Sequence, residues 1–353
     1  MRRLDLRWSN LRWLTVGLIT LLVLTPAAAA PVRPADVAST DAVLRWINAY
    51  RVKPDPTSVP TAMRALSRFG ALSEPERAGV YVGFLAGILG ANPDLAERII
   101  SDTLTIRADD HWIIVRAIAY SGLPNWKLTL RKFEPRIPLR RAMIEKYLSD
   151  DLPTLGQLVI GPAKTSYVRF QEHFQVGTPA RKVILEPSPE MLDILWGYYF
   201  ATASSGPVFR LIDLLPWSAD HDDLERLSIG SLAKYTLASN ATHDQTLLAI
   251  LKGASKARNQ SPLAVTALNE VVDAAETVNT ARIRKAALAA MDELRSKGPA
   301  YKRAVSWWGY VGQSVIAGGC IAAAVTGHIE LGIPCVVGGA SASAALNFWA
   351  NQP

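Results

Sequence analysis

Apolar residues recur at three- and four-residue spacing along most of the chain, which is the pattern of amphipathic helices. In residues 41–50, for example, one helical face collects Val43, Leu44, Ile47 and Tyr50. Prolines and glycines divide the pattern into segments, because proline often begins a helix and glycine often ends one. The sequence predicts an all-α fold, with helices at residues 41–50, 60–69, 75–89, 94–104, 111–121, 125–133, 139–148, 190–203, 207–215, 222–239, 245–257 and 262–297.

Two of the expected helix starts have the sequence of a capping box. In this motif a Ser or Thr side chain accepts from a free backbone N–H, and an acid or amide three residues later reaches back. The pairs are Ser73 with Glu76 and Thr242 with Gln245. The helix after Ser73, residues 75–89, is apolar on nearly every side, so we expect it at the centre of the fold.

One arrangement recurs along the chain: an apolar helix, a turn of small residues, a proline and an amphipathic helix. It occurs at residues 88–100, 119–133 and 202–215, and aligning Pro93 with Pro207 also aligns Gly83 with Gly197. A single helix pair cannot bury its own apolar face, so such pairs stack. We therefore expect stacked antiparallel helix pairs, either solenoid-like or as an irregular helical array. The alternative is that Gly and Pro simply separate unrelated helices.

The pattern divides the chain into five parts. Residues 1–29 are an expected signal peptide, and residues 30–150 and 188–299 are two helical halves. Residues 151–187 are rich in Pro and Gly and form an expected irregular connection between the halves. Residues 300–353 are an expected apolar, small-residue-rich helical hairpin.

Part of the second half resembles a known group of proteins. The run LWGYYFATASSGPVFRLIDLL and the following GSLAKYTLASNATHD (230–244) resemble uncharacterised secreted bacterial α-helical proteins with tetratricopeptide- or HEAT-like helix pairs. The resemblance covers residues 192–249, well under a quarter of the chain. Its motifs are packing motifs, so it implies a helical-pair fold and carries over no catalytic residue.

The N-terminus has the three parts of a secretory signal peptide. Four arginines precede an apolar stretch at residues 14–24, and small residues surround an expected cleavage site after Ala29. The apolar stretch is shorter than the roughly 20 residues that a bilayer-spanning helix needs. We expect export to the periplasm or cell envelope, with an uncleaved N-terminal anchor as the alternative.

The last fifty residues contain a single formal charge, Glu330. The uncharged runs 304–329 and 331–353 are each long enough to cross a bilayer. In a hairpin that turns near residue 330, aromatic residues from both ends would meet at one membrane interface: Trp307, Trp308, Tyr310, Phe348 and Trp349. Cys320 and Cys335 lie on opposite sides of the turn, and an oxidising compartment would permit a disulfide between them.

Two observations favour a different arrangement of this tail. Basic residues precede it on the side that export places outside the cytoplasm, against the positive-inside preference: Arg295, Lys297, Lys302 and Arg303. Gly and Ala also bury little apolar area, which limits the gain from insertion. A hairpin that packs against the preceding helices in a soluble protein therefore remains the alternative to membrane association.

Charge and motifs narrow the chemistry. The formal net charge is +7, and removal of the signal peptide, with four Arg and one Asp, would lower it to +4. No concentrated Lys/Arg run suggests nucleic-acid binding. The sequence lacks the G-x-S-x-G, H-E-x-x-H and phosphate-loop motifs, and it predicts no catalytic residue and no cofactor.

Two acidic clusters are the polar-site candidates. One is Asp220, His221, Asp222 and Asp223, and the weaker one is Asp109, Asp110 and His111. Such residues bind divalent metals when they converge, but both clusters precede expected helices, where Asp serves as an N-cap. No metal site is therefore predicted.

These features predict a non-enzymatic protein of the cell envelope. The leading hypothesis is a helical-repeat-like scaffold or partner-binding module that associates with a membrane through residues 300–353. The partner is a protein of unknown identity, and a lipid bilayer is a second expected contact. The alternatives are a membrane-inserting effector that acts through the glycine-rich hairpin and a hydrolase with a site between helices.

Overall fold

The computed structural model describes residues 37–160, residues 185–286 except 259, and residue 289. These residues form an all-α structure, and within them the only β pairing is an isolated bridge between Leu158 and Leu185. The helices are α1 (Thr40–Ala49), α2 (Val59–Arg68), α3 (Gly79–Ala91), α4 (Pro93–Thr103), α5 (Trp112–Tyr120), α6 (Trp126–Phe133), α7 (Arg141–Leu148), α9 (Pro189–Thr202), α10 (Ser205–Asp213), α11 (Leu224–Ala241), α12 (Gln245–Ser255) and α13 (Pro262–Glu276). Short 3-10 helices lie between them: η2 (Tyr50–Val52), η3 (Pro56–Ser58), η4 (Pro75–Arg77), η5 (Ala108–His111), η6 (Glu134–Arg136), η7 (Pro138–Arg140), η8 (Leu155–Gln157) and η9 (Leu215–Ala219).

Serine caps begin several of these helices. Ser39 Oγ accepts from Ala42 N at 3.1 Å at the start of α1, and Ser188 Oγ accepts from Met191 N at 3.1 Å at the start of α9. Each bond satisfies an N–H group that has no partner within the helix. Hydroxyl capping thus places these starts where the sequence pattern predicts them.

The two predicted capping boxes are wrong. The Ser73 hydroxyl donates to the Gly70 carbonyl at 2.6 Å, and the chain makes the turn η4 before α3 begins at Gly79. At the second position Asp244, not Thr242, is the cap of α12, and its Oδ1 accepts from Leu247 N at 3.0 Å. A carboxylate is the stronger acceptor at a helix N-terminus, because the helix dipole favours negative charge there.

The long helix expected at residues 262–297 is also interrupted. α13 ends at Glu276, and Val278 has a left-handed backbone with φ of 53°. Residues 277–280 read Thr-Val-Asn-Thr, which is a run of β-branched and turn-favouring residues with low helix propensity. The apolar stripe continues across this break, so periodicity alone does not reveal it.

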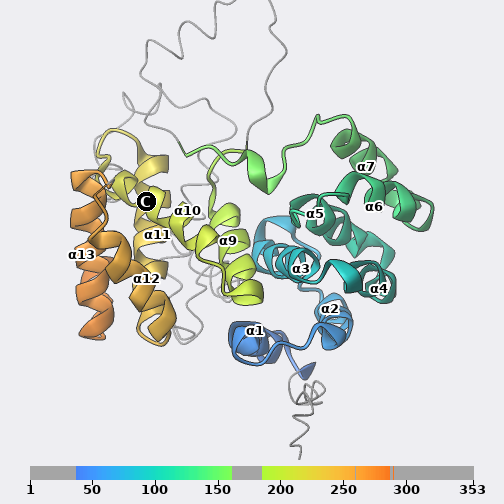
Figure 1. Ribbon diagram of the computed structural model, residues 1–353, viewed down its shortest axis with the longest axis horizontal. Helices are drawn as coiled ribbons and strands as arrows, with labels where there is room; N and C mark the ends of the chain where they lie inside the picture. The colour runs from blue at the N-terminus through green and yellow to red at the C-terminus, as the bar shows by residue number, and fades with distance from the viewer. Residues whose placement is uncertain (1–36, 161–184, 259, 287–288, 290–353) are drawn as a thin grey trace, which may run out of the picture.

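α3 lies at the centre of the described structure, as its apolar sequence predicts. Eleven of its thirteen residues are buried, so it has neighbours on all sides. α9, α5 and α4 pack around it, and α9 makes the most extensive contact. Figure 1 shows α3 and α9 side by side between two groups of helices. One group contains α2 and α4–α7, and the other contains α10–α13.

The crossing of α3 with α9 brings two backbones into direct contact. A Cβ atom at Gly83 would overlap the carbonyl oxygen of Ile194, and one at Gly197 would overlap that of Val80. The contact is reciprocal. Ile194, which faces Gly83, lies three positions before Gly197, and Val80, which faces Gly197, lies three positions before Gly83. The alignment of Gly83 with Gly197 in the sequence therefore corresponds to a local two-fold relation between the two helices. Glycine is required here because any side chain would force the helices apart.

The connection between the two helical halves is described only at its ends. Val159 N donates to Leu185 O at 3.0 Å, and Leu185 N donates to Gln157 O at 3.1 Å. The pairing is parallel, which holds the two ends of the connection together beside Leu158. No helix in the described part of the chain is both long and apolar enough to cross a membrane. Residues 1–29 and 300–353 lie outside the described residues.

Candidate functional site

The acidic cluster before α11 is divided among structural contacts. Asp223 is the N-cap, and its Oδ1 accepts from Glu225 N at 3.0 Å and Arg226 N at 3.2 Å. Asp220 forms an ion pair with Arg226 at 2.7 Å, while His221 and Asp222 are exposed. The four candidates therefore lie in one turn, where two of them start and anchor α11. No group of three or more metal-ligating side chains occurs in the part of the chain that the structure describes.

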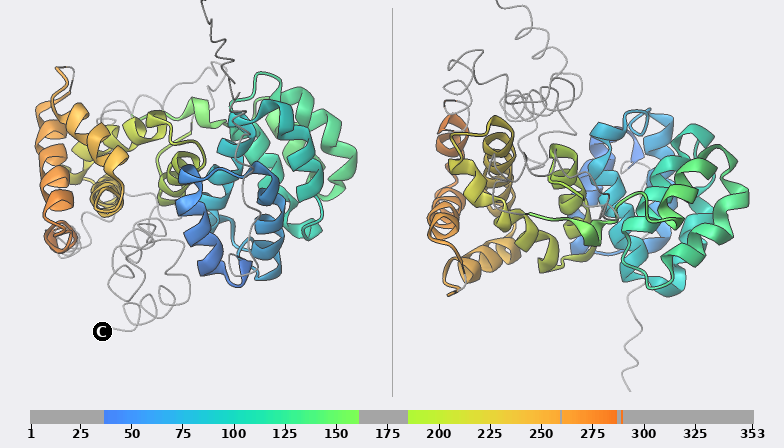
Figure 2. Two further views of the ribbon diagram at one scale, coloured as in Figure 1. Left: turned by 60° about the horizontal axis from the view of Figure 1, so that its bottom comes forward. Right: turned by 90° about the horizontal axis from the view of Figure 1, so that it is seen from above.

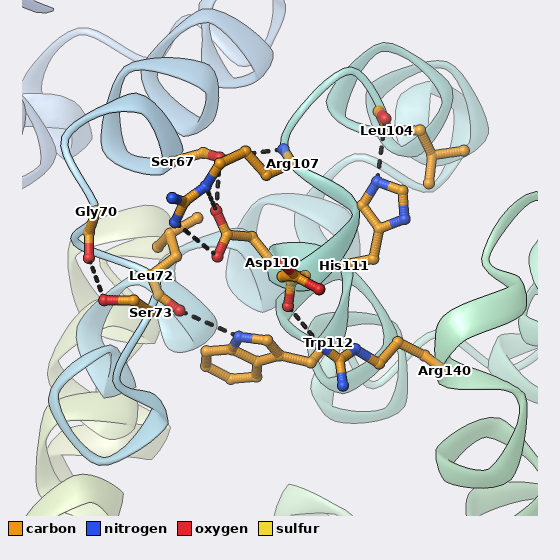
Figure 3. Close-up of polar contacts among 11 residues, drawn as sticks. Ser67, Gly70, Leu72, Ser73, Leu104, Arg107, Asp110, His111, Trp112 and Arg140 are labelled. Carbon is orange, nitrogen blue, oxygen red and sulfur yellow. Dashed lines mark hydrogen bonds and ion pairs between the residues drawn. The ribbon is translucent and has the colours of Figure 1, made fainter.

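The second acidic cluster joins three segments of the first half (Figure 3). Asp110 is 1% exposed and accepts from Ser67 Oγ at 2.6 Å and from Arg107 Nε at 3.0 Å. Ser67 Oγ in turn accepts from the backbone N of Arg107 at 3.1 Å. Ser67 and Asp110 lack a bridging base, because the His111 ring lies against the Leu104 carbonyl at 3.1 Å. The arrangement differs from a serine–base–acid triad and fixes η5 against α2.

Two further side chains in Figure 3 bind backbone carbonyl groups. Trp112 Nε1 donates to Leu72 O at 3.1 Å, and an Arg140 terminal nitrogen donates to Asp109 O at 2.6 Å. Both carbonyls lie outside α-helices, where the backbone has no intrahelical partner. These side chains therefore supply hydrogen-bond donors to backbone carbonyl groups and hold η5 and η7 in place.

A solvent-open cleft lies between the segment α1–η2 and the joint of α11 with α12. Its volume is about 280 Å³. The residues that line it come from both helical halves: Arg45, Asn48, Ala49, Arg51, Val52, Ser239, Asn240 and His243. Arg45 and His243 are exposed at this cleft, and Arg45 has no carboxylate partner among the described residues. Its lining is thus rich in hydrogen-bond donors.

Arg51 lies in the inner wall of this cleft and contacts several of its neighbours. The Arg51 guanidinium forms an ion pair with Asp244 at 2.8 Å and lies over the rings of Tyr199 and Phe200. Asp244 also accepts from Tyr199 Oη at 2.6 Å, and it is only 7% exposed. Burial and the bond to Asp244 raise the pKa of Tyr199, so that phenol stays protonated and donates. Sequence periodicity did not single out Arg51, because its partner is almost two hundred residues away.

A second buried acid lies at the α3–α9 crossing. Asp193 is 2% exposed, and its Oδ2 atom has no hydrogen-bond partner among the described residues. Burial, with a smaller contribution from the charge of Glu190, raises the pKa of Asp193 well above its usual range. The buried Tyr81 hydroxyl also has no partner in the described chain, and burial raises the pKa of Tyr81 as well. Burial thus favours the neutral carboxyl form of Asp193 over the carboxylate.

Glu190, one turn before Asp193, has a counter-ion. Its carboxylate forms a two-point ion pair with Arg116 of α5, with one bond of 3.2 Å. The Arg116 guanidinium lies 5.2 Å from the centre of the Tyr120 ring, and Tyr120 packs edge-on against Tyr147. These contacts join α9 to α5 and α7, so they also connect the two helical halves.

The remaining sequence candidates lie outside the described residues. These are the disulfide candidates Cys320 and Cys335 and the interface aromatics Trp307, Trp308, Tyr310, Phe348 and Trp349. The chain matches no protein-family model, and no curated protein or solved structure is significantly similar to it. Function is therefore inferred from the chain's own side chains.

Proposed function

We propose that this chain is an exported, non-enzymatic helical module of the cell envelope that binds a protein partner. Support comes from the structural roles of its polar clusters. Asp223 caps a helix, Asp110 joins a loop to α2, and Asp244 is neutralised by Arg51. Asp223 and Asp110, which the sequence offers as polar-site candidates, and Asp244 thus all hold helices together, as polar side chains do in a binding scaffold.

The observation that carries the proposal is the cleft between α1–η2 and the α11–α12 joint. Its mouth presents Arg45 and His243, and its inner wall contains Arg51, which Asp244 and two aromatic rings hold in one position. Arg51 is already paired with Asp244 and shapes the wall, whereas Arg45 has no carboxylate partner among the described residues and can bind one. The cleft is therefore suited to an acidic side chain or a terminal carboxylate on an extended segment of the partner.

Two further parts of the proposal concern the rest of the chain. The reciprocal contact of Gly83 with Gly197 supports the idea that α3–α4 and α9–α10 are related helix pairs, stacked about that crossing. Residues 1–29 are proposed to direct export, and residues 300–353 to hold the protein at a membrane as a hairpin stapled by Cys320 and Cys335. N-terminal sequencing of the protein from the envelope fraction tests the export signal. Cleavage after Ala29 predicts Ala30 as the first residue, and a start at Val32 or later would contradict it.

Site-specific cross-linking in the native cell tests the binding role. A photoreactive amino acid replaces Val52, which lines the cleft and is 83% exposed. The expected result is a discrete cross-linked band that disappears when Arg45→Glu is combined with it. Val278, which is 70% exposed and lies after α13, carries the same probe as the control. A band that survives Arg45→Glu, or that forms equally from Val278, would contradict binding in the cleft.

A further inference from the structure

The segment that forms α6, η6, η7 and α7 has a strong local excess of positive charge. Residues 125–149 contain seven Lys or Arg and two Glu, which gives a net charge of +5. The whole chain has a net charge of +7. The cations do not form a continuous run in the sequence, which is why a search for a basic run overlooks them.

Folding places these residues on the outside of one end of the molecule. In Figure 1 and in both views of Figure 2, α6 and α7 lie at the end opposite α13. α6 buries Thr129, Leu130 and Phe133, so Leu128 and Arg131 are directed outward next to each other. α7 buries Ile144 and Tyr147 and exposes Lys146. We call this surface of residues 127–146 the α6–α7 face.

Several cations on the α6–α7 face have no carboxylate partner. Arg131 and Lys146 form no ion pair with any described residue, Arg136 donates to Ser101 Oγ, and Arg140 donates to a backbone carbonyl. Ion pairs occupy the others: Lys127 with Asp150, Lys132 with Glu97 and Arg141 with Glu134. Glu145 is the exposed acid on this face. The face therefore keeps an excess of positive charge after its ion pairs are counted.

The same face exposes two large aliphatic side chains. Leu128 is 64% exposed on α6 and Leu139 is 61% exposed in η7. Each leucine is close in sequence to an unpaired cation, Leu128 to Arg131 and Leu139 to Arg140. Isolated exposed leucines are common on protein surfaces, but here they accompany excess positive charge at the end of the molecule.

We propose that the α6–α7 face binds the surface of an anionic lipid bilayer. Arginine and lysine side chains would contact the phosphates, and Leu128 and Leu139 would enter the boundary between headgroups and acyl chains. An end face can approach a plane without collision from the rest of the described structure. A fluid layer of headgroups can also match cations at uneven spacing, whereas an acidic protein would need fixed carboxylates opposite each one. This contact goes beyond the proposed cleft and does not depend on it.

Vesicle co-sedimentation of the full mature chain tests the proposal. The probes are phosphatidylcholine vesicles with and without phosphatidylglycerol, at low and high salt. Each cation near an anionic surface contributes about fivefold to binding. Arg131→Glu combined with Lys146→Glu is therefore expected to weaken the anionic-vesicle component at least about 20-fold. Leu128→Ser is expected to weaken binding by a smaller factor that salt does not change.

The matched control reverses the same number of charges at the opposite end. Lys256 and Arg258 are exposed beyond α12, and Lys256→Glu with Arg258→Glu changes net charge equally. The proposal requires this control to bind like the natural chain, with circular dichroism confirming that both variants are folded. If the two double variants lose vesicle binding equally, the effect depends only on net charge and the proposal is overturned.

Two other outcomes would also overturn the proposal. If vesicle binding does not depend on lipid charge or salt, the membrane contact would be assigned to residues 300–353 alone. Failure of the natural chain to bind anionic vesicles, with Lys146 protected from amine labelling by an envelope protein, would assign the face to an acidic protein. Cross-linking from Val52 reports on the cleft separately, so failure of one proposal is distinguishable from failure of the other.

Discussion

Two buried aspartates, Asp193 on α9 and Asp244 beside it, have contrasting surroundings. Asp244, at the joint of α11 with α12, has Arg51, Tyr199 and a helix N-terminus as partners. Asp193, at the α3–α9 crossing, has a buried oxygen with no partner in the described chain and a raised pKa. Asp244 therefore has a cation and hydrogen-bond donors around it, while burial of Asp193 favours its neutral form.

The difference follows from how closely the backbones approach. At the α3–α9 crossing glycines bring main chain against main chain, and a Cβ at Gly79 would lie 3.0 Å from the Asp193 Cβ. Among the described residues, no side chain donates a hydrogen bond to the Asp193 Oδ2 atom. At the α11–α12 joint the open cleft leaves room for a guanidinium. A tight helix crossing thus favours protonation, and a loose joint favours a counter-ion.

Removal of the counter-ion should produce the largest effect on stability. Arg51→Met keeps much of the side-chain volume but leaves the Asp244 charge buried without its cation. The expected cost is about 3 to 5 kcal/mol in the free energy of unfolding, measured by urea denaturation. Arg45→Met, at the exposed mouth of the same cleft, is the control and should change stability by less than about 0.5 kcal/mol. Equal effects would show that Arg51 does not neutralise Asp244.

Adding one methyl group at the crossing tests the close backbone contact. Gly83→Ala places a Cβ against the Ile194 carbonyl and should cost about 3 kcal/mol, the upper end for overpacking. Gly253→Ala in α12 is the control, because nothing lies within 4 Å of its Cβ position. That substitution should stabilise the protein by about 0.5 to 1 kcal/mol, since alanine favours helix. A tolerated Gly83→Ala would contradict the backbone contact.

The protonation of Asp193 predicts a pH dependence. Its raised pKa means that the folded state keeps a proton that the unfolded state releases near pH 3.9. Stability from this group is therefore full below that value and is lost as pH rises through the folded-state pKa. Asn does not titrate, so Asp193→Asn should gain stability relative to the natural chain as pH rises from 5 to 8, by about 1.4 kcal/mol for each unit by which the folded-state pKa of Asp193 exceeds 5. Denaturation curves that shift in parallel at both pH values would contradict a protonated Asp193.

The smallest effect is expected at an aspartate that is not deeply buried. Asp223 caps α11 as Asp244 caps α12, but it is only half-buried. Asp223→Ala should cost about 1 kcal/mol of stability, the usual value of a lost cap. Asp222→Ala next to it should have almost no effect, because Asp222 is exposed and caps nothing. If Asp223→Ala lost as much stability as Arg51→Met, the large effect at Arg51 could not be attributed to the buried charge of Asp244.

Local features of the sequence predict much of the helical pattern. Apolar periodicity, with flanking prolines and glycines, locates α1, α2 and α9 to within a few residues, because these signals act on the neighbouring backbone. Errors arise where two local signals compete. Asp244 displaces Thr242 as a cap, and the residues around Val278 end a helix whose apolar stripe continues.

The candidate sites could be predicted less well, because each joins residues distant in the sequence. Aligning Gly83 with Gly197 suggests related helices but gives no sign that the two glycines meet. Arg51 and Asp244 appear unrelated until folding brings them together, and Asp193 looks like an ordinary helix residue. The cations of the α6–α7 face are visible in the sequence only if charge is counted over about 25 residues, as on a helical surface.

The crossing of α3 with α9 also determines when the fold can form. Gly83 and Gly197 are 114 positions apart, so the central helix remains uncovered until the second half of the chain is available. Contacts over such a separation form slowly, since a long loop must close first. On the export route proposed above, that delay would be an advantage, because the polypeptide would stay open during transit and close only after α9 has emerged.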